Sequence, residues 1–111
     1  MLVEIPLQQI PNQKIEVVIN NNNLNIALYT AGDFLFIDLT VNNNIIILGA
    51  KVVNRAYINQ YPYVFNDYLF FATTDNSSPY YLTLGDITHL YYSDFDALSN
   101  DYKNWLGTYH G

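Results

Sequence analysis

The chain of 111 residues has room for one compact domain and is too short for two. Half of its residues are hydrophobic and 13% are charged, a composition that excludes a disordered chain. The formal net charge is −6, and no cluster of basic residues is larger than the pair Lys51 and Arg55. Both features argue against a surface that binds the phosphate backbone of nucleic acid.

The sequence contains no cysteine, which excludes a disulfide framework, a thiolate metal site and a cysteine nucleophile. The first residues lack the basic region and apolar run of a signal peptide, and Glu4 comes early. No apolar stretch approaches the ~20 residues that a membrane-spanning helix needs. We therefore expect a soluble protein without a membrane partner.

Three segments alternate apolar and polar residues as half-buried strands do, and a fourth is a short apolar run: residues 14–20, 24–30, 34–41 and 45–48. In the first segment, one face carries Ile15, Val17 and Ile19, and the other carries Lys14, Glu16 and Val18. Runs of asparagine at 20–23 and 42–44 suit tight turns, because asparagine tolerates positive φ. The pattern predicts a four-stranded antiparallel meander with one buried face.

The rest of the chain adds strands to this meander. Residues 68–73 and 88–92 are predicted strands, whereas residues 51–61 fit either a strand or a loop. Pro62 excludes a central strand at 61–63, because proline donates no ladder hydrogen bond. We therefore predict an all-β fold, a small antiparallel β-barrel or sandwich of about six to seven strands with a short C-terminal helix.

After the last strand the apolar period changes to that of a helix. Ser93 followed by Asp96 matches a helix start, and Gly107 matches a helix end. The apolar residues between them recur at helical spacing: Phe95, Leu98, Tyr102, Trp105 and Leu106. We expect one domain over 1–111, with a β core at 1–93 and an amphipathic helix at 94–106. The helix either closes an open end of its own domain or carries Trp105 to a neighbouring subunit.

Aromatic residues are the unusual part of the composition, with 11 Tyr, 6 Phe and 1 Trp. Tyrosine favours half-buried strand positions, and it is also enriched in protein interfaces. We assign most tyrosines to strands and the remainder to subunit contacts. The interface candidates are Tyr57, Tyr61, Tyr63, Phe65, Trp105 and Tyr109.

Residues that would carry catalysis are sparse. Neither His89 nor His110 stands in a nucleophile motif, and His89 heads a strand, where we expect a partly exposed structural histidine. Asp94 and Asp96 lack the glycine and glutamate that complete a calcium loop. We predict that the protein is not an enzyme and has no catalytic residue, no metal site and no cofactor.

Asp38 is the unusual polar residue of an otherwise apolar strand. It is expected to cap a turn or to form an ion pair with Lys51 or Arg55. A catalytic carboxylate is the third alternative, although no second acid accompanies it in the motif.

Motifs near the two ends of the chain point to a family. The chain opens with Ile5-Pro6-Leu7 and Pro11-Asn12-Gln13 and closes with Leu84-Gly85 and Leu90-Tyr91-Tyr92; between them stand Phe34-Leu35-Phe36-Ile37-Asp38-Leu39 and Ile45-Ile46-Ile47-Leu48-Gly49. In order and spacing, over residues 3–93, these motifs resemble the small baseplate plug family of contractile-tailed phages. Phe34 or Phe36 replaces a tryptophan of the family, and Asn66-Asp67 replaces a paired glycine.

The resemblance implies a structural subunit of a contractile phage tail baseplate or of a related injection machine. It implies a virion protein, made in the host bacterial cytoplasm, with several copies packed round the tail axis. The implied partners are other baseplate proteins, namely the hub, the spike and the tube or sheath initiator, which the protein would plug or bridge. The alternative is a carbohydrate- or cell-surface-binding β module whose aromatic rings stack on sugars.

Overall fold

The computed structural model describes residues 1–58 and 67–98 of the chain. This part of the chain forms seven β-strands and one short 3-10 turn, and it contains no α-helix. The elements in chain order are β1 (Leu2–Ile5), β2 (Gln13–Ile19), β3 (Asn22–Ala31), β4 (Phe34–Val41), β5 (Asn44–Lys51), β6 (Tyr68–Thr73), η1 (Tyr81–Thr83) and β7 (Thr88–Ser93).

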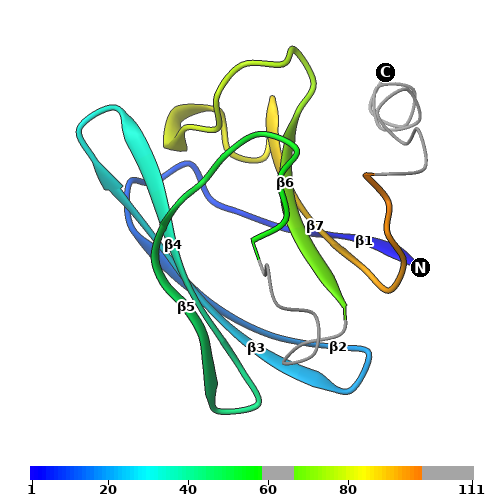
Figure 1. The fold of residues 1–111 in the computed structure, drawn as a ribbon. Coiled ribbons are helices and arrows are strands. Elements are labelled where there is room, and N and C mark those ends of the chain that lie inside the picture. Colours follow the sequence, from blue (N-terminus) through cyan, green and yellow to red (C-terminus); the bar gives the residue numbers. More distant parts are fainter. Residues whose placement is uncertain (59–66, 99–111) are drawn as a thin grey trace.

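The strands form two antiparallel sheets that pack face to face (Figure 1). One sheet has four strands in the order β2-β3-β4-β5, and the other has three in the order β1-β7-β6. The predicted all-β fold is confirmed. Between the two predicted architectures, the described residues form a sandwich, because no strand ladder joins the sheets into a closed barrel.

The predicted four-stranded meander is also confirmed, and asparagine forms two of its turns. β2 and β3 are joined through Asn20 and Asn21, with φ of 53° and 65°, and β4 and β5 through Asn42 and Asn43, with φ of 51° and 67°. Positive φ at both central residues defines the type I′ turn, whose twist matches that of the flanking strands. Because asparagine adopts this conformation more readily than other non-glycine residues, these short runs fix the strand register.

The main hydrophobic core lies between the two sheets. The apolar residues of β3 and β4 that alternation places on one face are the ones that become buried. The buried members of the core are Ile5, Leu24, Ile26, Leu28, Leu35, Ile37, Leu39, Val41, Val52, Ile58, Leu69, Phe71, Leu84, Leu90 and Tyr92. They come from both sheets and from the connection between β5 and β6, so one core joins the two sheets.

Residues 52–58 form an irregular connection that covers one flank of the sandwich. Val52 donates its N–H to the carbonyl oxygen of Leu35 in β4, and Ile58 donates to that of Leu69 in β6, each at 2.8 Å. Both side chains are buried in the core. This flank holds β5 and β6, so the opposite flank holds the edges of β1 and β2 (Figure 1).

β1 is not among the predicted strands, because its four residues are too few to show a period. It pairs with β7, where Ile5 lies opposite Leu90. The motifs that carry the family resemblance at the two ends of the chain are therefore neighbours in the fold. Contacts between residues so far apart in sequence explain why both ends belong to one pattern.

The predicted helix at 94–106 is not shown. Its described part, residues 94–98, forms bends and a turn, and residues 99–106 lie outside the described residues. Ser93 ends β7 instead of capping a helix there: its Oγ accepts the N–H of Phe95 at 3.0 Å and donates to the carbonyl oxygen of Phe95 at 2.7 Å. These two bonds close a local turn, which is an alternative that serine offers to the main chain.

Candidate functional site

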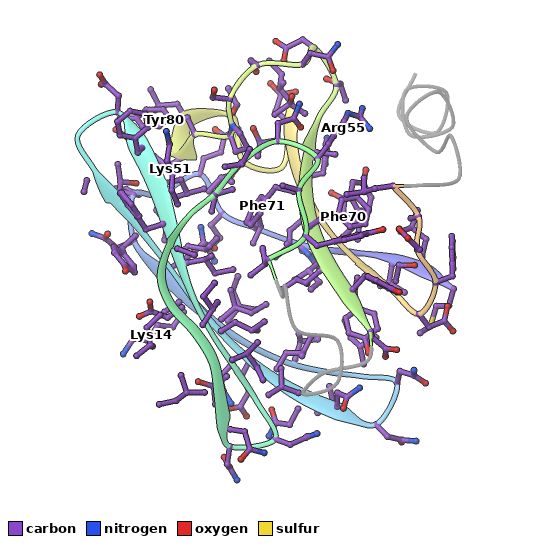
Figure 2. All side chains as sticks on the ribbon, in the orientation of Figure 1. Lys14, Lys51, Arg55, Phe70, Phe71 and Tyr80 are labelled. Atoms are coloured by element: carbon purple, nitrogen blue, oxygen red, sulfur yellow. The ribbon has the colours of Figure 1, made fainter. Side chains whose placement is uncertain are left out.

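The far face of the three-stranded sheet carries a second apolar cluster. Phe70 and Phe71 of β6 point to opposite sides of the sheet, Phe71 into the sandwich and Phe70 away from it (Figure 2). The buried members of the second cluster are Phe70, Ala72, Tyr91 and Ala97, and Leu2, Tyr57, Phe95 and Leu98 pack against them. The chain therefore covers both faces of this sheet by itself.

Tyr57 is the predicted interface residue that the structure describes, and it packs within its own chain. The centroid of its ring lies 4.7 Å from that of Tyr68 and 5.8 Å from that of Phe70. Its hydroxyl donates to the carboxylate of Asp96 and accepts the N–H of Leu98 at 3.0 Å. Burial, together with the Asp96 carboxylate, raises the pKa of Tyr57. Tyr57 thus fastens residues 96–98 to the sheet, and its role in a subunit contact stays a prediction.

The other predicted interface residues lie outside the described residues: Tyr61, Tyr63, Phe65, Trp105 and Tyr109. So does His110, the second histidine considered for catalysis. The assignment of these aromatic residues to subunit contacts therefore stays a prediction.

The outer face of the four-stranded sheet is a described surface with the character of an interface. Val18 of β2 is 68% exposed there, and Ile45 and Leu48 of β5 are 65% and 63% exposed. Phe34, at the start of β4, is 47% exposed, and the ammonium of Lys51 lies 3.9 Å from its ring centroid. The sequence contains one indication of this surface, the continuous apolar run of β5. Neighbouring strand residues point to opposite faces, so such a run places apolar side chains on the outer face as well as on the inner one. Exposed apolar groups gathered on one face are a mark of contact surfaces.

A hollow of about 570 Å³ lies on this outer face. Short side chains of the two central strands line it, Asn25 and Ala27 from β3 and Thr40 from β4, and longer side chains flank it from β2 and β5. No aromatic ring lines this hollow. Aromatic rings lie beside it on the same face: Tyr29 stacks on Phe36 and lines a neighbouring hollow.

Asp38 lies on the same face, beside an irregularity in the pairing of β4 with β5, and its side chain binds the main chain of β5 there. The register of β4 against β5 shifts beside it. Its Oδ1 accepts the N–H of Gly49 at 2.6 Å and the hydroxyl of Tyr29 at 3.3 Å. Among the described residues no ion pair joins Asp38 to Lys51 or Arg55, so that alternative is wrong for the described structure and the turn-capping role is the nearest to what is observed.

His89 was expected to be partly exposed, and that prediction is wrong, because the residue is buried. Its Nδ1 lies 2.6 Å from Oε2 of Glu4, and its Nε2 lies 2.7 Å from the carbonyl oxygen of Asp86. The sequence gives no signal for this arrangement, because Glu4 comes to His89 only when β1 pairs with β7.

Within residues 1–58 and 67–98, no three metal-ligating side chains gather at one place. The acids considered as calcium ligands have other partners: Asp94 binds the N-terminal ammonium of Met1 at 2.6 Å, and Asp96 accepts the hydroxyl of Tyr57. A helix with the length and apolar character to span a bilayer is not found in the described part of the chain.

The fold and its surfaces define the class of a small β-sandwich with exposed apolar side chains on one sheet face. A family model described as cyanophage baseplate Pam3 plug gp18 matches residues 2–96. No curated protein matches the chain. Because the match spans every described strand, the chain belongs to this baseplate plug family, and the resemblance inferred from its motifs is confirmed. The protein is accordingly a structural component of a phage tail baseplate, located in the tail of the virion, and it interacts with other baseplate proteins.

Proposed function

We propose that this protein plugs or bridges the centre of the baseplate, between the hub and spike and the tube or sheath-initiating ring. The observation that carries the proposal is the family match over residues 2–96, which includes both sheets of the sandwich. Several copies pack round the tail axis and act by shape, without catalysis. They help to keep the conduit closed until contraction rearranges the baseplate.

The outer face of the four-stranded sheet supports this proposal as one contact surface. Its exposed Val18, Ile45 and Leu48 offer apolar area that a partner subunit would bury. The Tyr57 to Phe65 segment and the C-terminal residues that carry Trp105 are proposed as further contacts, because aromatic side chains dominate the energetics of many interfaces.

Cross-linking mass spectrometry on purified, uncontracted particles tests the proposal. Lys14 lines the hollow on the outer face and Lys51 lies beside Phe34, so both amines report on neighbours of that face. We expect links from them to hub, spike or tube proteins. Absence of this protein from the particle would contradict the proposal and favour the free binding module.

Variants then assign the faces. We expect a double change of Ile45 and Leu48 to serine to reduce incorporation into particles, whereas Leu82→Ser, at a residue 61% exposed in η1, leaves incorporation unchanged. Individual alanine variants of Tyr61, Tyr63 and Trp105 test the other contacts in the same assay. Normal particles from all of these variants would remove both surfaces from the proposal.

A further inference from the structure

Sheet edges expose unpaired main-chain groups, and three of the four edges in the sandwich are protected. The edge of β6 is covered by residues 54–58, where Arg55 donates its N–H to the carbonyl oxygen of Phe71 at 2.8 Å. The edge strand β5 pairs with β4 in shifted register, so it is irregular. β1 has four residues and is followed by Pro6.

β2 is different, because it is a regular edge strand of seven residues. It pairs with β3 in continuous register from Gln13 to Ile19. In Figure 1 it forms the border of the four-stranded sheet, on the flank that residues 52–58 do not cover. Among the described strands, β2 therefore offers the longest regular edge for a further strand.

The two-residue turn fixes which groups of β2 point outward. Ile19 and Asn22 flank the turn and exchange both main-chain hydrogen bonds, so every second residue of β2 from Ile19 backwards bonds to β3. The residues between direct their N–H and C=O groups away from the sheet: Lys14, Glu16 and Val18. Within the described chain no hydrogen bond reaches these groups from beyond the sheet.

The side chains of these three residues are exposed on the outer face, and Figure 2 shows Lys14 pointing away from the sandwich. On the other face, Ile15 and Val17 are only half-buried at the border of the core. An added strand would continue the sheet and cover the remaining exposed area of these two side chains.

We propose that the edge of β2 pairs, antiparallel and centred on Ile15, with the same edge of a second copy of this chain. In this register Lys14 of each copy lies opposite Glu16 of the other, and Ile15 lies opposite itself. The dimer thus contains two cross-strand ion pairs related by a two-fold axis. This inference concerns the free protein and does not rest on the proposed function.

Charge selects this register among those that the outward groups allow. Pairing centred on Lys14 places the two lysines opposite each other, and pairing centred on Glu16 places the two glutamates opposite each other. Pairing centred on Val17 or Val18 leaves every charged residue of the edge without an opposite charge across the strands. Like charges directly opposite destabilise a strand pair, whereas opposite charges stabilise it.

Sedimentation of the full chain between about 10 µM and about 1 mM tests the dimer, because one strand pair buries little area and gives weak association. We expect Lys14→Glu and Glu16→Lys each to weaken dimerisation roughly tenfold, since each variant turns two attractive pairs into repulsive ones. The double variant restores the pairs in reversed order and is expected to recover the dimer. Monomer throughout, or no recovery in the double variant, would overturn the proposal.

Single cysteine variants test the register, because the natural chain has no cysteine and any disulfide joins two copies. Directly opposed residues of a non-hydrogen-bonded pair lie within disulfide distance, so Ile15→Cys is expected to cross-link rapidly on mild oxidation. Val18→Cys is the control: it is more exposed, yet in this register the two copies of residue 18 lie far apart. Faster cross-linking of Val18→Cys than of Ile15→Cys would overturn the register. Both charge variants change exposed side chains, so they test the proposal even if Ile15→Cys fails to fold.

Discussion

Glu4 of β1 and His89 of β7 are joined by a hydrogen bond that links the beginning of the chain to its last described strand, with 2.6 Å between Oε2 and Nδ1. The other ring nitrogen, Nε2, faces the carbonyl oxygen of Asp86 at 2.7 Å. Each ring nitrogen of His89 thus lies within hydrogen-bond distance of an oxygen atom of the same chain. The pair fastens the short edge strand β1 to the sheet.

Removing the carboxylate of Glu4 is therefore expected to destabilise the fold. We expect Glu4→Ala to lower the free energy of unfolding by about 1 to 2 kcal/mol, and Glu4→Gln to lower it less, because the amide oxygen still accepts a hydrogen bond. Glu16→Ala is the matched control and should change stability by less than about 0.5 kcal/mol. Urea unfolding at about 5 µM, where β2 edges stay unpaired, measures all three. Equal effects of the two alanine variants would show that the contact between Glu4 and His89 contributes nothing to stability.

The turn at Asp75 gives a prediction for the titration of a carboxyl group. Oδ1 of Asp75 accepts from Oγ of Ser77 at 2.5 Å and from its N–H at 3.0 Å, and these bonds lower the pKa of Asp75 from 3.8. The ionised form is thus favoured by folding, so its contribution to stability is present above pH 3.8 and is lost as the pH falls through the folded-state pKa.

Carbon-detected NMR titration of the Asp75 carboxyl group measures whether its pKa is lowered in the folded protein. We expect Ser77→Ala to move the pKa of Asp75 back toward 3.8, because the hydroxyl bond is the largest cause of the shift. Ser78→Ala, one residue further on, should leave the pKa where it is, since no bond joins Ser78 to Asp75 among the described residues. If the pKa of Asp75 were the same in Ser77→Ala as in the natural chain, the hydrogen bond from the Ser77 hydroxyl would not be the cause of the shift.

Local signals explain which parts of the fold the sequence predicts. Alternation and paired asparagines lie within each hairpin, so the meander from β2 to β5 follows from segments of a few residues. The place of β1 depends on Leu2 meeting Ser93 across nearly the whole chain, and no local period encodes that contact. In the described residues after Ser93, the helical pattern of the sequence is not matched by a helix, because the hydroxyl of Ser93 bonds to Phe95 and closes a turn.

The candidate site is less predictable than the fold, because composition does not distinguish aromatic rings that pack within the chain from those that contact a partner. Tyr57 is a reasonable interface residue by type, yet its ring and hydroxyl contact Phe70 and Asp96 of its own chain. The exposed Val18 and Ile45 were not predicted as interface residues, because they are aliphatic and the prediction was based on aromatic residues. Their strand positions nevertheless put them on the outer face. The family motifs contribute most, because they carry information on contacts between distant segments.

Gly85 belongs to one of those motifs, and its surroundings explain why a glycine stands there. Its φ is +80°, and a Cβ at this position would lie 3.2 Å from the carbonyl oxygen of Leu7, in the motif at the other end of the chain. Gly32 has a similar φ of +60° but nothing within 4 Å of an added Cβ. We expect Gly32→Ala to cost about 1 kcal/mol from backbone strain alone, and Gly85→Ala to cost at least about 2 kcal/mol, since main-chain atoms must also shift. Thermal and urea unfolding compare the two variants, and equal losses would mean that the contact with Leu7 is unimportant.

Tyr92 of β7 connects the two sheets, and its hydroxyl gives a prediction at high pH. It donates to the carboxylate of Asp67 and accepts from the side-chain amide of Asn22 in β3 at 3.1 Å. Burial, followed by the Asp67 hydrogen bond, raises the pKa of Tyr92 from 10.0 to about 12. Because folding favours the protonated hydroxyl, its contribution to stability is complete below pH 10 and is lost as the pH rises toward about 12.

We expect Tyr92→Phe to lower the free energy of unfolding at pH 7 by about 1 to 3 kcal/mol, because a hydrogen bond to a charged group is removed. The variant should also lose less stability than the natural chain between pH 10 and about 12, since the group that titrates there is gone. Tyr81→Phe serves as the control, because Tyr81 is half-buried and its hydroxyl makes no hydrogen bond to another described residue. Urea unfolding at a series of pH values measures these differences. If Tyr92→Phe matched the natural chain at every pH, the hydroxyl would not hold the sheets together, and the apolar core between them would have to do so alone.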